Sequence, residues 1–318
     1  MAFSEFELIN RFFNRPVHRA SVGIGDDCAL LKCKPGTQLA VSSDMLVEGR
    51  HFLSTVNPKH LGHKALAVNL SDLAACGARP LGFTLALALP QADESFLQPF
   101  SQGLLALAEH YDCELIGGDT TQGPLNICIT VLGEVAEGHA LLRDGARAGD
   151  DIYVSGRVGD ARLALEVFRG KMTLIGEDFT RVRKAMEQPE PRVELGLALR
   201  GLATSAIDVS DGLLGDLQHI LNRSQIGALI WVDAVPISPV LATLPTACQR
   251  LCALSGGDDY ELVFTASPVL RHQLQQLSQR VQLPLTRIGE ITRTPGIELR
   301  DAHGQLVSQQ FSSFDHFA

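Results

Sequence analysis

The sequence predicts a two-domain protein of the α+β and α/β classes. The expected N-terminal domain, residues 1–138, has a mixed β-sheet with helices, and the expected C-terminal domain, residues 139–318, is α/β. The chain of 318 residues is long enough for two domains of ordinary size. Stretches with strand and helix periodicity follow one another in both halves. Between Glu137 and Asp151 the sequence is rich in Gly, Arg and Asp, which indicates a boundary.

In the first half, apolar residues at helical spacing predict an amphipathic helix over residues 3–14. Asn57 as N-cap and Pro58 in the first turn predict a helix that runs toward Gly77. A further helix is expected from about Glu94 to His110, although Pro99 weakens its first part. Strands are expected at residues 28–31 and 39–42, as neighbours, at 82–89 and 126–135, and at 114–119, where the strand runs into a glycine turn.

The second half alternates expected strands and helices. The strands are expected at residues 152–155, 206–209, 228–232 and 262–265, and the helices at 159–168, 192–202, 213–221 and 268–280. The longest uncharged run, residues 234–249, contains three prolines, so we expect a loop-rich segment and not a helix. No window approaches the ~20 apolar residues that a membrane span needs.

Composition excludes several classes of function. The formal charge of -9 argues against a protein that binds nucleic acid or an anionic membrane non-specifically, because both need basic surface. The first residues carry Glu5, Glu7 and Arg11 within an apolar pattern, which is unlike a signal peptide, and we expect a cytoplasmic protein. Seven scattered cysteines without a C-x-x-C pair predict neither disulfides nor a zinc site.

Acidic residues next to glycine or serine recur along the chain. They occur in the stretches Gly23–Asp27, Ser42–Asp44, Asn69–Asp72, Gly117–Thr120, Asp208–Gly212 and Gly256–Asp259. Glycine admits positive φ angles and the close approach of a ligand. Side chains alternate along an extended chain, so one of Asp26 and Asp27 is expected to face the site.

These carboxylates point to a hard divalent cation. Two charges ~4 Å apart repel by about 4 kcal/mol at an effective dielectric of ~20, so several acids converge only around cations. Oxygen ligands without His or Cys favour Mg²⁺, Mn²⁺ or Ca²⁺ over zinc, and acids dispersed in ones and twos suit Mg²⁺ with a nucleotide. Taken singly, Asp208 or Asp211 could only cap the helix at Leu213, and Asp119 could be an ordinary turn residue. Asp72, inside an apolar helix, would be costly without a partner.

Together the motifs resemble the thiamine-monophosphate kinase family, in the superfamily of aminoimidazole ribonucleotide synthetase. Their order from Gly23 to Phe317, with the pair His51-Phe52 and the terminal Asp315-His316-Phe317, carries the resemblance over nearly the whole chain. Nucleotide motifs of other kinases, such as G-x-x-x-x-G-K-[ST], H-R-D and D-F-G, are missing from the sequence. The resemblance implies ATP-dependent phosphorylation of thiamine monophosphate to thiamine diphosphate, the last step in making that cofactor, by a homodimer whose N-terminal domains meet.

The resemblance also implies roles for particular residues. Several Mg²⁺ ions would be held by Asp27, Ser42, Ser43, Asp44, Asp72, Asp119 and Asp208, with Asp211 binding a further one. The nucleotide would contact Gly118, Asp119, Arg143 and Ser210. The thiamine substrate would contact His51, Asp258 and Phe314. The acceptor is already a phosphate oxyanion, so no general base is assigned, and we expect direct in-line transfer assisted by metal ions.

Two departures and three alternatives accompany this interpretation. Many relatives carry Glu where this chain has Asp258, and Tyr or Trp where it has Phe314. Another ATP-using enzyme of the superfamily remains an alternative, although the Cys or Sec of a selenophosphate synthetase is missing from the N-terminal segment. The others are a Mg²⁺-dependent phosphohydrolase and a non-catalytic cation-binding module, which an array of motifs over two domains disfavours.

Overall fold

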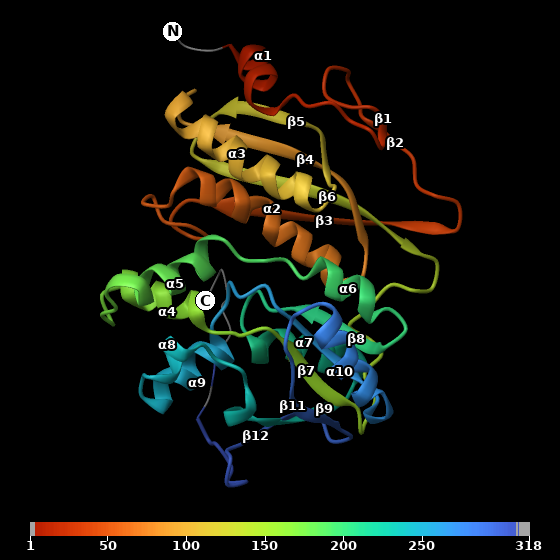
Figure 1. Ribbon diagram of the computed structural model, residues 1–318, viewed down its shortest axis with the longest axis vertical. Coiled ribbons are helices and arrows are strands. Elements are labelled where there is room, and N and C mark those ends of the chain that lie inside the picture. Colours follow the sequence, from red (N-terminus) through yellow and green to blue (C-terminus); the bar gives the residue numbers. More distant parts are fainter. Residues whose placement is uncertain (1–3, 310, 312–318) are drawn as a thin grey trace. The chain divides into compact units, whose positions relative to one another are not determined.

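The computed structural model describes residues 4–309 and residue 311 (Figure 1). The chain divides into two compact units. The first consists of the chain up to Leu73 together with Ala78–Gly138, and the second consists of Ala74–Gly77 and the chain from His139 onward. The short segment before Ala78 therefore belongs to the second unit, although the sequence surrounding it builds the first.

The first unit is built on a four-stranded mixed sheet with the strand order β3-β6-β4-β5. Only the pair β4 and β5 is parallel among these neighbours. Helices α2 and α3 cover one face of this sheet (Figure 1). The bounds are β3 Thr37–Val47, α2 Pro58–Ala75, β4 Arg79–Leu89, α3 Glu94–His110, β5 Glu114–Gln122 and β6 Asn126–Ala136.

Side chains alternate along the strands of this sheet, so that one face of the sheet is packed and the other is more open. On β4 the side chains of Phe83, Leu85, Leu87 and Leu89 are buried. The helices that cover this face pack closely, because a Cβ added at Gly103 of α3 would lie 1.8 Å from the carbonyl oxygen of Lys59 on α2. Glycine is therefore required where the two helices meet.

Three expectations for the first half are corrected. The helix over residues 3–14 is α1 Glu5–Leu8 followed directly by a π-helical segment, Ile9–Phe13. The strands expected as neighbours are not paired: β2 Leu30–Leu31 pairs with β1 Ala20–Val22, whereas β3 pairs with β6. Strand β5 also continues through Gly117 and Gly118 and does not turn there, because pairing with β4 extends to Gln122.

The second unit is built on a six-stranded sheet with the order β12-β9-β11-β7-β10-β8. Only the edge pair β12 and β9 is parallel among these neighbours. The strands are β7 Asp151–Ser155, β8 Ala203–Asp208, β9 Gly227–Trp231, β10 Leu262–Ala266, β11 Leu285–Thr292 and β12 Gly296–Arg300. Strands and helices alternate along the sequence of this unit, but strands that are neighbours in the sheet are not consecutive in the chain. The result is a mixed sheet.

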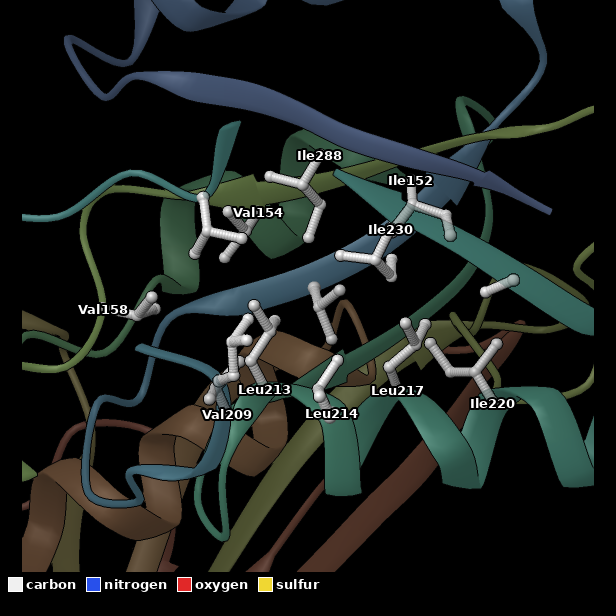
Figure 2. Close-up of a cluster of buried hydrophobic side chains, with 14 of the residues drawn as sticks. Ile152, Val154, Val158, Val209, Leu213, Leu214, Leu217, Ile220, Ile230 and Ile288 are labelled. Atoms are coloured by element: carbon white, nitrogen blue, oxygen red, sulfur yellow. The ribbon is translucent and has the colours of Figure 1, made fainter. Parts of the chain in front are cut away.

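Two hydrophobic clusters organise the second unit. In the larger one, Leu213, Leu217 and Ile220 of helix α7 pack against the sheet residues Ile152 and Ile230 (Figure 2). The smaller one joins side chains from the helices α4, α5, α8 and α9. The helices of this unit are α4 Asp160–Phe168, α5 Gly176–Glu187, α6 Val193–Leu199, α7 Leu213–Ser224, α8 Pro239–Ala242, α9 Thr246–Ser255 and α10 Arg271–Arg280.

Helix α5 and strands β11 and β12 were not expected from the sequence. The uncharged run 234–249 is also not purely a loop, because it contains α8 and the start of α9. Prolines at the starts of these helices explain the error: Pro239 occupies the first turn of α8 and Pro245 is the N-cap of α9, positions that proline tolerates. Among the helices that the structure describes, none has the length and apolar character required to cross a membrane.

The buried carboxylate of Asp151 at the start of β7 gives a prediction for acid stability. It accepts hydrogen bonds from Arg271 at 2.6 and 2.7 Å and from Arg287 at 3.0 Å. Desolvation acts to raise the pKa of Asp151, but the two guanidinium groups outweigh it and hold the pKa below its usual value. A lowered folded-state pKa contributes stability above the ordinary Asp pKa of about 3.9, and this contribution is lost as the pH falls through the lower folded-state value.

We therefore expect the Asp151→Asn variant to lose stability at neutral pH and to show a weaker fall in stability below about pH 4 than the wild type. Urea unfolding measured at several pH values between neutrality and acid tests this expectation. Parallel pH curves for wild type and variant would contradict it.

Candidate functional site

A cleft of about 700 Å³ lies in the first unit. One wall is the loop Gly23–Asp27, and a second is the segment Gly117–Thr120 of β5. The N-terminal helical segment, Glu5–Phe13, forms a third wall with Phe6, Ile9 and Phe13. The volume lies within the ~300–1,000 Å³ that small-molecule sites occupy.

Glu114 at the start of β5 fixes the chain that leads into the Gly23–Asp27 loop. Its carboxylate accepts backbone N–H groups from His18 at 2.6 Å, Arg19 at 2.9 Å and Ala20 at 3.1 Å. Desolvation opposes ionisation, but these donors outweigh it and lower the pKa of Glu114. Glu114 was not expected from the sequence, since only the fold brings together segments that are almost a hundred residues apart.

Asp27 and Asp119 both line the cleft, on different walls. Asp26 lines it as well, and its Oδ1 accepts the N–H of Asp27 at 2.9 Å. The segment is a loop, so the strand alternation on which the expectation of a single inward-facing carboxylate rested does not apply to it. Asp119 lies within β5, so its alternative interpretation as an ordinary turn residue is also excluded.

Gly118 lets β5 approach β4 beside this cleft. Its φ angle is +146°, and an added Cβ would lie 1.9 Å from the carbonyl oxygen of Leu85. We expect Gly118→Ala to destabilise the protein by several kcal/mol, since both a disfavoured backbone conformation and a backbone clash result. Gly138→Ala is the matched control, because Gly138 also has a positive φ but nothing within 4 Å of its Cβ position. Equal losses of unfolding free energy in the two variants would contradict the packing argument.

A second polar group joins α2 to β3. The Ser42 hydroxyl donates to the carboxylate of Asp72, and the N–H of Asp44 donates to Oδ1 of Asn69 at 3.1 Å. Asn69 is buried, and its amide also donates to the Ala65 carbonyl at 3.0 Å. The spacing of three residues between Asn69 and Asp72 thus places both toward β3, as the helical pattern predicts. Asp44 lies inside β3, which extends beyond the strand expected at residues 39–42.

The register of the sheet shows that the polar group between α2 and β3 lies some distance from Asp119 of the cleft. Asp44 pairs with Ile129, Ile129 with Leu85, and Leu85 with Gly118, so Asp44 and Gly118 lie in one row across the sheet. Three interstrand steps of ~4.8 Å place their backbones about 14 Å apart. The Ser43 hydroxyl contacts Thr130 Oγ1 at 3.0 Å, and alternation puts it on the face opposite Ser42 and Asp44.

His51 lies in the turn after β3. Its Nδ1 accepts the N–H of Val47 at 3.0 Å, and its carbonyl accepts Nζ of Lys64 at 3.1 Å. Lys64 is 2% exposed and was missed, although a lysine within the apolar run of α2 is a signal that could have drawn attention. Phe314, a second of the three expected substrate residues, lies outside the described residues.

A third polar group is formed in the second unit by the end of β8 and the loop before β10. Asp208 ends β8, and Ser210 and Asp211 follow it. The N–H of Asp258 donates to the Ser210 carbonyl at 2.8 Å, so the two loops run side by side. Asp258 has a φ angle of +68°, and its Oδ1 accepts the hydroxyl of Tyr260 at 3.1 Å. The structure therefore brings Asp258 next to the Asp208–Asp211 segment.

Asp216 holds the Ser210–Gly212 turn in place. Its Oδ2 accepts the N–H groups of Ser210 and Asp211 at 3.0 Å and that of Gly212 at 3.1 Å. Desolvation raises the pKa of Asp216 to about 7, although these donors act in the opposite direction. The N-cap of α7 is Gly212, so neither Asp208 nor Asp211 occupies the N-cap position that the alternative interpretation gave them. Asp216 was not among the residues expected from the sequence, because it lies inside α7 and outside the acidic stretches named from the sequence.

Arg143 is exposed and lies apart from Ser210 in the second unit. Its carbonyl accepts the hydroxyl of Ser224 at 3.0 Å, at the C-terminal end of α7. Ser210 precedes the N-terminal end of the same helix, which has 12 residues and is therefore about 18 Å long. These two expected nucleotide residues are not neighbours within this unit.

The carboxylates occur in small groups that fit Mg²⁺ shared with a substrate. Within residues 4–309, no three His, Cys, Asp or Glu side chains form a metal site by themselves. Mg²⁺ is commonly bound through one or two carboxylates, with substrate phosphates and water as the remaining ligands. Asp27 and Asp119 across the cleft, and Ser42 with Asp72, provide oxygen donors of this kind.

Comparisons with known proteins agree with the two-unit architecture. Residues 25–135 match the family model described as AIR synthase related protein, N-terminal domain, and residues 147–302 match the model of its C-terminal domain. The thiamine-monophosphate kinase of Escherichia coli strain K12 is 45% identical over 329 aligned positions, which cover 100% of this chain and 99% of that protein.

Two solved structures extend this similarity. The crystal structure of thiamine-monophosphate kinase from Stenotrophomonas maltophilia K279a has a TM-score of 0.87 and 45% identity, covering 96% of this chain and 99% of that one. A structure described as AaThiL complexed with AMPPCP and TMP has a TM-score of 0.77 and 28% identity, covering 90% of this chain and 89% of that one. These similarities confirm the two-domain α+β class expected from the sequence.

Proposed function

The chain belongs to the thiamine-monophosphate kinase family of AIR synthase related proteins, and from this premise we propose how its residues serve the reaction. It is a phosphotransferase that phosphorylates thiamine monophosphate with ATP. The terminal phosphoryl group of ATP moves to a phosphate oxygen of thiamine monophosphate, which leaves ADP and thiamine diphosphate. The observation that carries the assignment is the cleft in which Asp27 and Asp119 flank glycine-rich backbone.

We assign Mg²⁺ binding to the three polar groups. The residues are Asp27 and Asp119 at the cleft, Ser42, Asp44 and Asp72 between β3 and α2, and Asp208 and Asp211 in the second unit. Ser43, also expected as a ligand from the sequence, has its hydroxyl on the opposite face of β3 and is not part of these groups. The oxygen donors and their occurrence in ones and twos support this assignment. Bound Mg²⁺ supplies charge neutralisation between two polyanionic substrates. Because the protein has a formal charge of -9, it needs such cations to accept phosphates near its own carboxylates.

The chain's residues then bind and orient the two substrates. Backbone at Gly118, with Asp119, Arg143 and Ser210, contacts the nucleotide in this proposal, and His51, Asp258 and Phe314 contact the thiamine part. Phe314 keeps an aromatic face for the cationic thiazolium ring. No residue is assigned as general base, because the attacking phosphate oxygen is already ionised, and alignment of the two phosphates is the main requirement. Transfer is therefore direct, without a phosphorylated enzyme.

A product assay tests the proposed function. The purified chain is incubated with Mg²⁺, ATP and thiamine monophosphate, and thiamine diphosphate and ADP are quantified by chromatography. We expect equal amounts of both products and no covalent phosphate on the protein after rapid quenching with labelled ATP. Release of inorganic phosphate independent of thiamine monophosphate would indicate a phosphohydrolase, and ADP without thiamine diphosphate would indicate another acceptor.

We also propose a homodimer formed through the first unit. Leu39, Val41 and Met45 on the edge strand β3 are 46%, 58% and 53% exposed, and alternation places them on the face opposite Ser42 and Asp44. A contiguous exposed apolar face on a sheet is typical of an interaction surface, and a second copy of the same chain is the partner that we propose. Sedimentation should show a dimer for wild type and a monomer for Val41→Lys. A dimer of unchanged stability would contradict the assignment of this face.

We place the protein in the cytoplasm. All seven cysteines are free thiols, which suits a reducing compartment.

A further inference from the structure

We propose that the N-terminal helical segment, Glu5–Phe13, binds the base of the nucleotide, with Phe6 stacked on the ring. This inference rests on the proposed function, since it gives the cleft its base-binding wall. The acids and glycines of the cleft account for the phosphate end of ATP, but they leave the apolar wall without a role. None of the residues Phe6, Ile9, Asn10 and Phe13 belongs to the expected site.

One face of the helical segment lines the cleft, and another packs into the body of the unit. Phe6, Ile9, Asn10 and Phe13 line the cleft, at the i, i+3, i+4 and i+7 spacing of one helix face. Leu8 and Phe12 are buried with exposed fractions of 3% and 1%. They anchor the segment to the body of the unit, so the lining residues are held in place by packing on the other side.

Additional contacts fix the segment at both ends. Ser4 and Glu7 form a capping box at its start. At its end the ring of Phe13 meets Phe100 of α3 edge to face, with the ring centroids 6.4 Å apart. Residues Ile9–Phe13 form a π-helical turn, closed by the N–H of Asn14 donating to the Ile9 carbonyl at 2.9 Å. Such turns are often found at functional sites.

Phe6 has the exposure expected of a stacking platform. It is 75% exposed while it lines the cleft, so it contributes little to the packed core. An aromatic ring in that position offers a flat apolar surface to a planar base. Asn10 lies one helical turn further along the same face, and its carboxamide can both donate to and accept from the edge of a base.

The distribution of chemistry across the cleft matches a nucleoside triphosphate. The N-terminal wall, apolar apart from Glu5 and Asn10, suits a base, and the other walls carry Asp27, Asp119 and the backbone of Gly118. Carboxylates repel phosphates unless a cation lies between them, so the acidic walls take the phosphate end as a Mg²⁺ complex. A ligand that is apolar at one end and a metal-bound polyanion at the other fills both walls.

The test measures nucleotide binding without the acceptor. Calorimetric titration of the full chain with Mg²⁺ and AMPPCP should give a Kd about tenfold higher for Phe6→Ala than for wild type, a change of about 1.4 kcal/mol. Phe6→Tyr, which keeps the ring, should bind within about twofold of wild type. Val269→Ala is the control, because Val269 is an apolar residue that is 83% exposed and lies in the second unit.

Tripolyphosphate with Mg²⁺ separates loss of the base contact from general damage. It has no base, so wild type and Phe6→Ala should bind it equally. Equal AMPPCP affinity in the two proteins would overturn the inference and leave the kinase assignment standing. A loss of tripolyphosphate binding equal to the loss of AMPPCP binding would overturn it as well. A change in sedimentation of Phe6→Ala with unchanged AMPPCP binding would instead assign Phe6 to a contact between copies of the chain.

Failure of the proposed function gives a different result. If wild type binds AMPPCP with the expected dependence on Phe6 but forms no thiamine diphosphate, the inference about the base-binding wall is supported. The assignment of thiamine monophosphate as the acceptor is then wrong. If wild type does not bind AMPPCP at all, both are wrong.

Discussion

Asp72→Asn is expected to lower kcat/KM for the kinase reaction by about 100-fold or more, the scale found when a group that stabilises transition-state charge is removed. Asparagine has nearly the same shape and can still accept the Ser42 hydroxyl, so the contact between α2 and β3 is retained. The negative charge is lost, and with it the attraction for Mg²⁺. The measurement is thiamine diphosphate formation over a range of Mg²⁺ concentrations.

The dependence on Mg²⁺ distinguishes a metal ligand from a structural residue. For Asp72→Asn we expect half-saturation at higher Mg²⁺, with an unfolding free energy close to that of wild type. Glu109→Gln is the matched control, since Glu109 is an exposed carboxylate on α3 in the same unit. If Asp72→Asn retained full activity at the Mg²⁺ concentration that half-saturates wild type, Asp72 would not be a metal ligand.

Arg192→Ala is expected to destabilise the protein by about 3–5 kcal/mol. The guanidinium donates to Glu261 at 2.7 and 2.5 Å, and Ser155 donates to the same carboxylate at 2.5 Å. Glu261 is 4% exposed, so removal of Arg192 leaves a buried charge without its main partner. Urea unfolding provides the measurement, with the change in free energy taken from the shift of the midpoint.

A double variant and a surface control test the cause. Arg192→Met combined with Glu261→Leu removes both charges, and its stability should exceed that of Arg192→Ala, because no unpaired charge remains buried. Arg300→Ala breaks a pair with Glu298 whose side chains are 44% and 46% exposed, and should cost less than about 1 kcal/mol. A loss for Arg192→Ala as small as that for Arg300→Ala would show that the buried pair contributes little.

Most helices and strands of the first unit followed from periodicity and caps. Phe83 and Leu85 alternate with less buried residues as a half-covered strand should, and Pro58 begins α2 as the sequence indicates. The two failures that concern strands have a common cause. The sequence does not show which strand pairs with which, so β2 was grouped with β3, and the continuation of β5 through Gly117 and Gly118 was read as a turn.

The candidate site was predictable in its chemistry and less so in its arrangement. Carboxylates beside glycine and serine can be found in the sequence directly, and their preference for hard cations follows from their oxygen atoms. The residues with which such side chains form hydrogen bonds cannot be found in this way. Asp216 shapes the Ser210–Gly212 turn from within a helix, and Glu114 reaches a segment that precedes it by almost a hundred residues.

The sequence by itself determined the two-domain class, the acidic residues suited to a hard cation and the family to which the chain belongs. These depend on local spacing and residue type, which each stretch carries on its own. Only the tertiary structure decided which polar residues are neighbours. Asp27 and Asp119 meet at one cleft, whereas the strand register holds the backbones of Asp44 and Gly118 about 14 Å apart. Register and loop packing depend on contacts between distant parts of the chain, so no single stretch encodes them.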